Sequence, residues 1–221
     1  MPRLKQSQLE ESMLIEGWGI MINSGVPIIH SLNVLRDSFP QYAKELVDVQ
    51  DYIREGKSIC DALEKHPRSF HPVFYALVDA GEIVGGLAEM LMKTADFIRT
   101  DINYGIDWRE KVSSPELTKI MFYRCTATFI DAGIPLLKSL RVTEKMPALQ
   151  SMQKPIAEIC KEIEEGSTFS EAMDKQQKYF PALDVTLVKA GELGGALEVV
   201  MQRLADYAER RYFASLKSSI R

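Results

Sequence analysis

The chain repeats one pattern twice, and this duplication limits the folds that its 221 residues can adopt. Residues 80–87 read Ala-Gly-Glu-Ile-Val-Gly-Gly-Leu, and residues 190–197 read Ala-Gly-Glu-Leu-Gly-Gly-Ala-Leu. Without a gap, 14 of the 47 positions in 55–101 are identical to their counterparts in 165–211. A repeat of about 110 residues is too long for a solenoid, whose units have roughly 20–50 residues. It is long enough for each copy to enclose a core of its own.

An earlier match fixes the extent of the two copies. Residues 22–32 match residues 130–140 at an offset of 108 rather than 110, so a change of two residues in length lies between the two matched regions. The sequence therefore predicts two tandem homologous domains, 1–112 and 113–221.

The spacing of apolar residues predicts helices almost throughout both copies. In the last segment, apolar residues recur every three or four positions, as they do on one face of a helix. These residues are Leu193, Leu197, Val200, Met201, Leu204 and Ala208. No strand-type alternation is sustained, and each copy divides into six helices joined by short turns. The fold class expected is all-α, with two tandem antiparallel six-helix bundles.

Glycine and proline mark the ends of the early helices in the same way in each copy. Gly25 and Pro27 in copy one correspond to Gly133 and Pro135 in copy two. Glycine adopts the left-handed conformation that ends a helix, and proline has the φ angle that starts one. We therefore expect structural turns at these four residues.

The repeated Gly-Glu motif is expected to form the turn before the longest helix of each copy. We expect Gly81 and Gly191 to end the fifth helix with positive φ. Gly85 and Gly195 would begin the sixth helix and allow close packing. The same pattern places Ser58 and Thr168 at the N-caps of short helices, with an acidic residue three positions on, which is close to a capping box.

Glu82 and Glu192 are the candidate partner-binding residues, because they occupy matching positions beside the matching glycines. At a helix start, the dipole favours a carboxylate by about 0.3–1 kcal/mol, which would also explain them as capping residues. The alternative is a polar contact with a neighbouring domain or a cation.

The sequence favours no catalytic, cofactor or metal site. Neither glycine cluster is followed by the Lys-Ser/Thr of a phosphate-binding loop, and no His-Glu-x-x-His or paired Cys-x-x-Cys is present. Three histidines, all in copy one, are expected at the surface or at helix ends. Three cysteines, an odd number, argue against a disulfide framework, and Cys125 is expected in the core. With a net charge of −4, no nucleic-acid partner is expected.

The ordered set of motifs resembles the cytoplasmic domain of the type II secretion F family. The set comprises Gly-Val/Ile-Pro, then Glu-Gly-x-Ser/Thr, then Phe, then Gly-Glu-x-x-Gly-x-Leu before a long helix. It occurs twice, from Gly25 to Leu87 and from Gly133 to Leu197, and with the helices on either side of each set the resemblance covers nearly the whole chain.

This resemblance implies a non-enzymatic platform protein in the bacterial inner membrane, with these domains on the cytoplasmic side. Its implied partners are a cytoplasmic assembly ATPase, other inner-membrane platform components, and pilin or pseudopilin. A homo-oligomer is also compatible with it. The implied function is to couple the ATPase to pilin or pseudopilin polymerisation in type II secretion or type IV pilus assembly.

The sequence departs from the family at the membrane spans that should follow each cytoplasmic domain. No window of about 18 apolar residues is present, and copy one passes through residues 108–117 directly into copy two. We expect that the spans of a longer parent protein are missing here and that the two domains join near Ser113 and Ser114. Basic residues on the last helix, Arg203, Arg210 and Arg211, suit either an anionic membrane surface or a solvated helix end.

Two further functions remain open from the sequence. One is a soluble adaptor made by duplication of a helical domain. The other is an enzyme with a site between the two bundles, which would need convergent titratable groups that the motifs do not provide.

Overall fold

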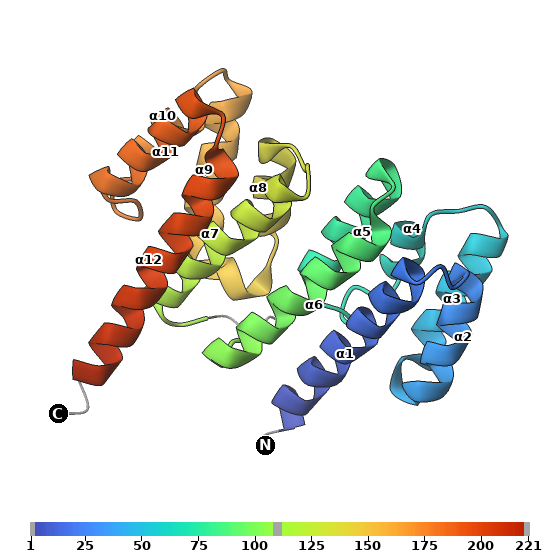
Figure 1. Cartoon of the computed structure of the whole chain (residues 1–221). Helices are drawn as coiled ribbons and strands as arrows, with labels where there is room; N and C mark the ends of the chain where they lie inside the picture. The colour runs from blue at the N-terminus through green and yellow to red at the C-terminus, as the bar shows by residue number, and fades with distance from the viewer. Residues whose placement is uncertain (1–2, 108–111, 219–221) are drawn as a thin grey trace. The chain divides into compact units, whose positions relative to one another are not determined.

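The computed structural model describes residues 3–107 and 112–218, and these residues form helices and connecting turns without a strand (Figure 1). The all-α class is therefore confirmed. The chain divides into two compact units, Met1–Arg109 and Glu110–Arg221. The elements of unit 1 are α1 (Arg3–Asn23), α2 (Ile28–Ser38), the 3₁₀ helix η1 (Pro40–Tyr42), α3 (Ala43–Arg54), α4 (Ile59–Leu63), α5 (Pro72–Val84) and α6 (Leu87–Tyr104). Those of unit 2 are α7 (Pro115–Asp131), α8 (Leu136–Glu144), the 3₁₀ helix η2 (Pro147–Met152), α9 (Gln153–Glu164), α10 (Phe169–Asp174), α11 (Ala182–Gly194) and α12 (Leu197–Ser218).

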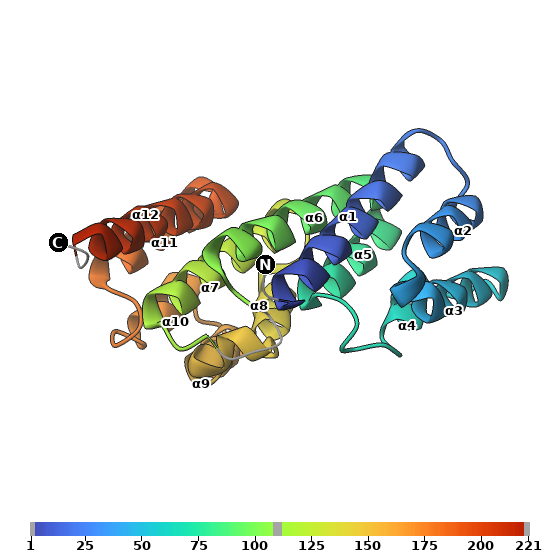
Figure 2. The same cartoon turned by 90° about the horizontal axis from the view of Figure 1, so that it is seen from below.

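In unit 1, the first and last helices pack along each other in opposite directions (Figure 2). Near the start of α1, the side chain of Gln8 bonds to the carbonyl of Ile106, just beyond the end of α6. Further along, the Arg99 guanidinium pairs with Glu16 at 2.6 Å. A continuous core lies behind this pair of helices. Its fully buried members include Leu14, Trp18, Leu32, Val49, Phe70, Phe74 and Ile98.

Unit 2 uses the same pairing, with α7 and α12 as its first and last helices (Figure 1). Its core is built from the corresponding faces of its own helices. Fully buried members include Phe122, Phe129, Leu140, Ile156, Ile159, Phe169, Phe180 and Met201. Cys125 is also fully buried, as expected from the sequence.

The early glycines have the left-handed backbone that a helix end requires. The φ angle is 81° at Gly25 and 78° at Gly133. Pro27 and Pro135 are the N-cap residues of α2 and α8, so each helix begins one residue later. The expected caps at Ser58 and Thr168 are confirmed, and Thr168 forms a complete capping box with Glu171.

The glycines of the repeated motif exchange the roles predicted for them. Gly81 and Gly191 do not end a helix, because α5 and α11 continue through them to Val84 and Gly194. The left-handed residues are Gly85, with φ of 85°, and Gly195, with φ of 64°.

Close packing also occurs at the other pair of glycines. A Cβ atom added to Gly81 would lie 2.9 Å from the Cα of Leu87 at the start of α6. One added to Gly191 would lie 2.9 Å from a methyl carbon of Val200 in α12. Gly85 and Gly195 have no such neighbour within 4 Å. The helices α5 and α6 therefore pack closely at Gly81, and α11 and α12 pack closely at Gly191. The left-handed residue of each turn, Gly85 or Gly195, lies four residues later.

Candidate functional site

The sequence predicted that Glu82 and Glu192 lie at the start of the long helices, and this prediction is wrong. They lie near the ends of α5 and α11, and each carboxylate reaches a different, shorter helix. Glu82 accepts hydrogen bonds from the backbone N–H groups of Ile59, at 2.6 Å, and Cys60, at 3.0 Å. Glu192 accepts the same pair from Phe169, at 2.7 Å, and Ser170, at 3.1 Å. The expectation that each glutamate begins a long helix was therefore wrong, because α5 and α11 continue past it, although a capping role was anticipated.

These bonds complete the N-terminal ends of α4 and α10. The first N–H groups of a helix have no partner within the helix. In α4, Glu82 bonds the first two, and the Ser58 hydroxyl accepts from the third, that of Asp61. In α10, Glu192 and Thr168 divide the same groups in the same way. A carboxylate also suits the positive end of the helix dipole. The repeated glutamate thus joins two helices within each unit.

A second cluster of titratable groups lies inside unit 1, around His71. This residue is the N-cap of α5, which is one of the helix-end positions expected for the histidines, but its side chain is fully buried. Its Nδ1 accepts from the N–H of Val73, so the neutral ring carries its proton on Nε2 and donates it to Asp101, 3.1 Å away. Its backbone N–H donates to the carboxylate of Glu11. One signal of this cluster is visible in the sequence: Glu11, His71 and Asp101 have no counterparts of the same type in copy two.

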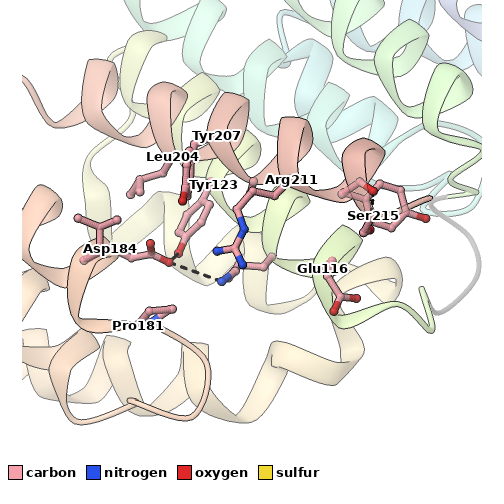
Figure 3. Close-up of a pocket in the computed structure, with 12 residues that line it drawn as sticks. Glu116, Tyr123, Pro181, Asp184, Leu204, Tyr207, Arg211 and Ser215 are labelled. Carbon is pink, nitrogen blue, oxygen red and sulfur yellow. Dashed lines mark hydrogen bonds and ion pairs between the residues drawn. The ribbon is translucent and has the colours of Figure 1, made fainter. Parts of the chain in front are cut away.

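Unit 2 has a pocket of about 480 Å³ between α7, α11 and α12, which we call the α7–α12 pocket (Figure 3). Side chains at every third or fourth position of α7 and α12 form its two walls, and the start of α11 closes one end. The lining residues are Glu116, Lys119, Tyr123, Pro181, Leu183, Asp184, Leu204, Tyr207, Ala208, Arg211, Tyr212 and Ser215.

A buried polar contact forms the inner end of the α7–α12 pocket. The Tyr123 hydroxyl donates to Asp184 at 2.5 Å, and the Lys119 ammonium lies 3.6 Å from the same carboxylate (Figure 3). Burial, reinforced by the charge of Asp184 and this hydrogen bond, raises the pKa of the Tyr123 hydroxyl far above its ordinary value. The hydroxyl is therefore a hydrogen-bond donor at neutral pH and not a base.

The outer part of the pocket is more exposed and carries a second cation. The guanidinium of Arg211 lies 5.8 Å from the centre of the Tyr207 ring, within the range of a cation–π contact. Tyr207 and Leu183 are 42% and 54% exposed, which leaves apolar surface open beside this charge. Glu116 lies at the end of the pocket away from Asp184 (Figure 3), and its carboxylate accepts a hydrogen bond from the Ser114 hydroxyl at 3.0 Å. From its sequence, Arg211 was expected only at an anionic membrane surface or at a solvated helix end, not in a pocket.

The cysteines lack the properties of reactive thiols. Burial, with help from nearby carboxylates that include Asp79, raises the pKa of Cys60 to about 12. Burial likewise raises the pKa of Cys160 to about 11. The thiolate is the reactive form of cysteine, so both groups are held in the unreactive form at neutral pH. Cys125 is fully buried.

We expect slow alkylation of the native protein by iodoacetamide at pH 8. An increase in pKa from 9.0 to about 12 lowers the thiolate fraction of Cys60 about 1,000-fold, and the increase to about 11 lowers that of Cys160 about 100-fold. Mass spectrometry would follow each thiol in the native chain and in the guanidinium-unfolded chain as the control. Labelling of any native cysteine at the unfolded rate would contradict this expectation.

Residues 3–107 and 112–218 contain neither a group of metal ligands nor a helix able to span a membrane. Within these ranges, no three His, Cys, Asp or Glu side chains are grouped as a metal ion would require. Nor does any described helix have both the length and the apolar character needed to cross a membrane.

Comparison with known proteins identifies the family. The sequence model described as "Type II secretion system (T2SS), protein F" matches residues 14–117 and again residues 122–221. The type IV pilus assembly protein PilC of Myxococcus xanthus is 38% identical over 102 residues, which are 46% of this chain and 24% of that protein. The type II secretion system protein F of Xanthomonas campestris pv. campestris is 36% identical over 91 residues, or 41% of this chain and 22% of that protein. The chain spans about a quarter of the length of these relatives. Because the family pattern matches both copies, the chain belongs to the type II secretion system protein F family.

Proposed function

We propose that this chain provides two cytoplasmic domains of a platform protein in a type II secretion or type IV pilus assembly machine. The single observation that carries this proposal is the tandem match of the family pattern to both copies. The relatives in both kinds of system bear names that place them in secretion or pilus assembly. We further propose that each copy, 1–112 and 113–221, is an independently folding six-helix bundle.

The proposed role is to couple a cytoplasmic assembly ATPase to polymerisation of pilin or pseudopilin at the bacterial inner membrane. A platform of this kind transmits force and position through surfaces, so it needs no catalytic site of its own. The raised pKa values of Cys60, Cys160 and Tyr123 support this, since none of the three is poised as a nucleophile or base.

We propose Glu82 and Glu192 as partner-binding residues, but only part of each carboxylate is open to a partner. Two helix N–H groups already bond each carboxylate, and both side chains are half-buried. A partner would reach only the lone pairs that those bonds leave over.

The test is direct binding to the cognate assembly ATPase, measured by biolayer interferometry with the chain immobilised. We expect weak binding, with Kd on the order of 10 µM, because a membrane-held protein gains its avidity from local concentration. The chain itself should hydrolyse no ATP. Each copy is then tested alone, once its thermal melt is shown to be cooperative.

Two outcomes would count against the proposal. Absence of binding by the whole chain at about 100 µM ATPase, ten times the expected Kd, would remove the coupling role. A coding region with no hydrophobic spans after Ser113 or Ile220 would favour the alternative, a duplicated helical adaptor.

A further inference from the structure

The two units carry different side chains in the place where the α7–α12 pocket lies. At the offsets of 108 and 110 residues that relate the two copies, Lys119 corresponds to Glu11 and Arg211 to Asp101. In unit 1, these two carboxylates lie on either side of the fully buried His71 and bond to its backbone and its ring. The equivalent of His71 in unit 2 is Pro181, which has no polar side chain. The three positions that hold a buried, hydrogen-bonded group in unit 1 therefore line the pocket in unit 2.

In unit 1, a short segment of chain also covers the place equivalent to the end of the pocket at Glu116 and Ser215. Gly105, with φ of 68°, ends α6, and the chain turns back toward α1. The Ile106 carbonyl accepts from the side-chain amide of Gln8 at 3.0 Å, and Ile106 is only 3% exposed. In unit 2, α12 continues without a break through Ser215, the equivalent of Gly105, to Ser218. No described residue of unit 2 therefore makes the turn that Ile106 makes in unit 1.

The change of residues also reverses the charge. Two acidic positions of unit 1 become basic in unit 2, and the two cations are not equally engaged. Lys119 lies beside Asp184, which also accepts from Tyr123. Arg211 is exposed, and its guanidinium makes a cation–π contact with the Tyr207 ring. Among the described residues, no carboxylate lies at ion-pair distance from Arg211. Glu116, the other acid of the pocket, bonds to Ser114.

We propose that the α7–α12 pocket binds an extended segment of a partner protein that carries an aliphatic residue followed by an acidic one. The aliphatic side chain would pack on Leu204, Leu183 and Ala208, which supply apolar surface in the same pocket as Arg211, the first and last of them within one or two helical turns of it on α12. The adjacent carboxylate would pair with Arg211. A carboxylate and a guanidinium form one of the stronger polar contacts in proteins. The segment Gly105-Ile106-Asp107 of unit 1 itself has this order of residues.

This inference rests on the proposed function for the identity of the partner, which would be a component of the same machine. The chemistry of the pocket is independent of that identity and can be tested alone. Peptide binding without ATPase binding would leave the pocket assignment intact and remove the proposed function. ATPase binding without peptide binding would contradict the pocket assignment and leave the proposed function intact.

The experiment is an NMR titration of the whole ¹⁵N-labelled chain with the peptide acetyl-Gly-Ile-Asp-Gly-amide. We expect saturable shifts confined to α7, the start of α11 and α12, with Kd on the order of 1 mM, as befits a short peptide. Replacing the peptide aspartate by asparagine, or its isoleucine by glycine, should weaken binding at least about fivefold, the loss of one contact of about 1 kcal/mol.

Protein variants locate the site. Arg211→Ala should weaken binding at least about fivefold. Arg210→Ala is the matched control, since Arg210 is an exposed neighbour on α12 that does not line the pocket, and it should bind as the unaltered chain does. Ala208→Phe should fill the pocket and abolish binding while the melting temperature shows that the fold is retained.

Three results would overturn the proposal. One is the absence of saturable shifts at about 10 mM peptide, ten times the expected Kd. Another is an equal effect of Arg210→Ala and Arg211→Ala, which would mean unspecific charge attraction. The third is that inorganic phosphate alone reproduces the shifts at the same concentration, which would make the place a simple anion site.

Discussion

Gly81→Val should destabilise unit 1 by about 3 kcal/mol, the upper end of the range for overpacking a core. The added Cβ would lie 2.9 Å from the backbone Cα of Leu87, which cannot move without shifting the start of α6. Gly191→Val should cost less, because its nearest neighbour at 2.9 Å is the side chain of Val200. Thermal melts would check both, with a loss of about 10 °C or more expected for Gly81→Val.

Alanine variants separate close packing from helix propensity. Inside a helix, alanine is more stable than glycine by about 1 kcal/mol, so propensity alone predicts stabilisation. At Gly81 we expect alanine to destabilise, because the clash begins at Cβ. Gly194 is the matched control, since it lies within α11 and nothing lies within 4 Å of its Cβ position. Gly194→Ala should therefore leave stability unchanged or raise it. If Gly81→Ala also stabilises, the close approach of α5 and α6 is not a constraint.

Glu82→Ala and Glu192→Ala should each destabilise their own unit by about 2–3 kcal/mol. Each change removes a carboxylate that bonds two backbone N–H groups, and a hydrogen bond to a charged group contributes about 1.5–3 kcal/mol. Water can replace part of that loss because both side chains are half-buried. Urea unfolding at constant pH would measure the change for each variant.

Two further variants define what the carboxylates contribute. Glu82→Gln keeps an oxygen acceptor and should lose about half as much stability. Glu89→Ala is the control, since Glu89 is an exposed acid in the first turn of α6 whose pair with Lys93 is worth only about 0.3–0.5 kcal/mol. Equal effects of Glu82→Ala and Glu89→Ala would show that the two backbone bonds add nothing.

The helical class and most helix ends follow from local sequence. Apolar spacing identifies the helices, and Gly25 and Gly133 mark turns because left-handed backbone favours glycine. The assignment failed where one residue type has two uses. Gly81 and Gly85 are four residues apart, and glycine serves both a close approach and a positive φ. Deciding between the two uses requires the position of α6 relative to α5, which only the tertiary structure provides.

The role of the repeated glutamates was hidden for a related reason. Glu82 bonds to a residue 23 positions earlier in the chain, beyond the range of any local capping pattern. The α7–α12 pocket was harder still, since a cavity has no motif. The signal lay in the differences between the copies, such as Asp101 against Arg211, whereas the family resemblance directs attention to what the copies share.

The carboxylate caps on α4 and α10 also bear on the order in which the chain folds. Helices of five and six residues are far below the length at which an isolated helix persists in water. Each needs an acceptor that arrives only after a loop of more than 20 residues has closed. The long, locally stabilised helices can form early, whereas α4 and α10 must wait for α5 and α11 to dock. The glutamate of each Gly-Glu pair would then act late on the folding pathway, when α4 or α10 becomes ordered after the longer helices.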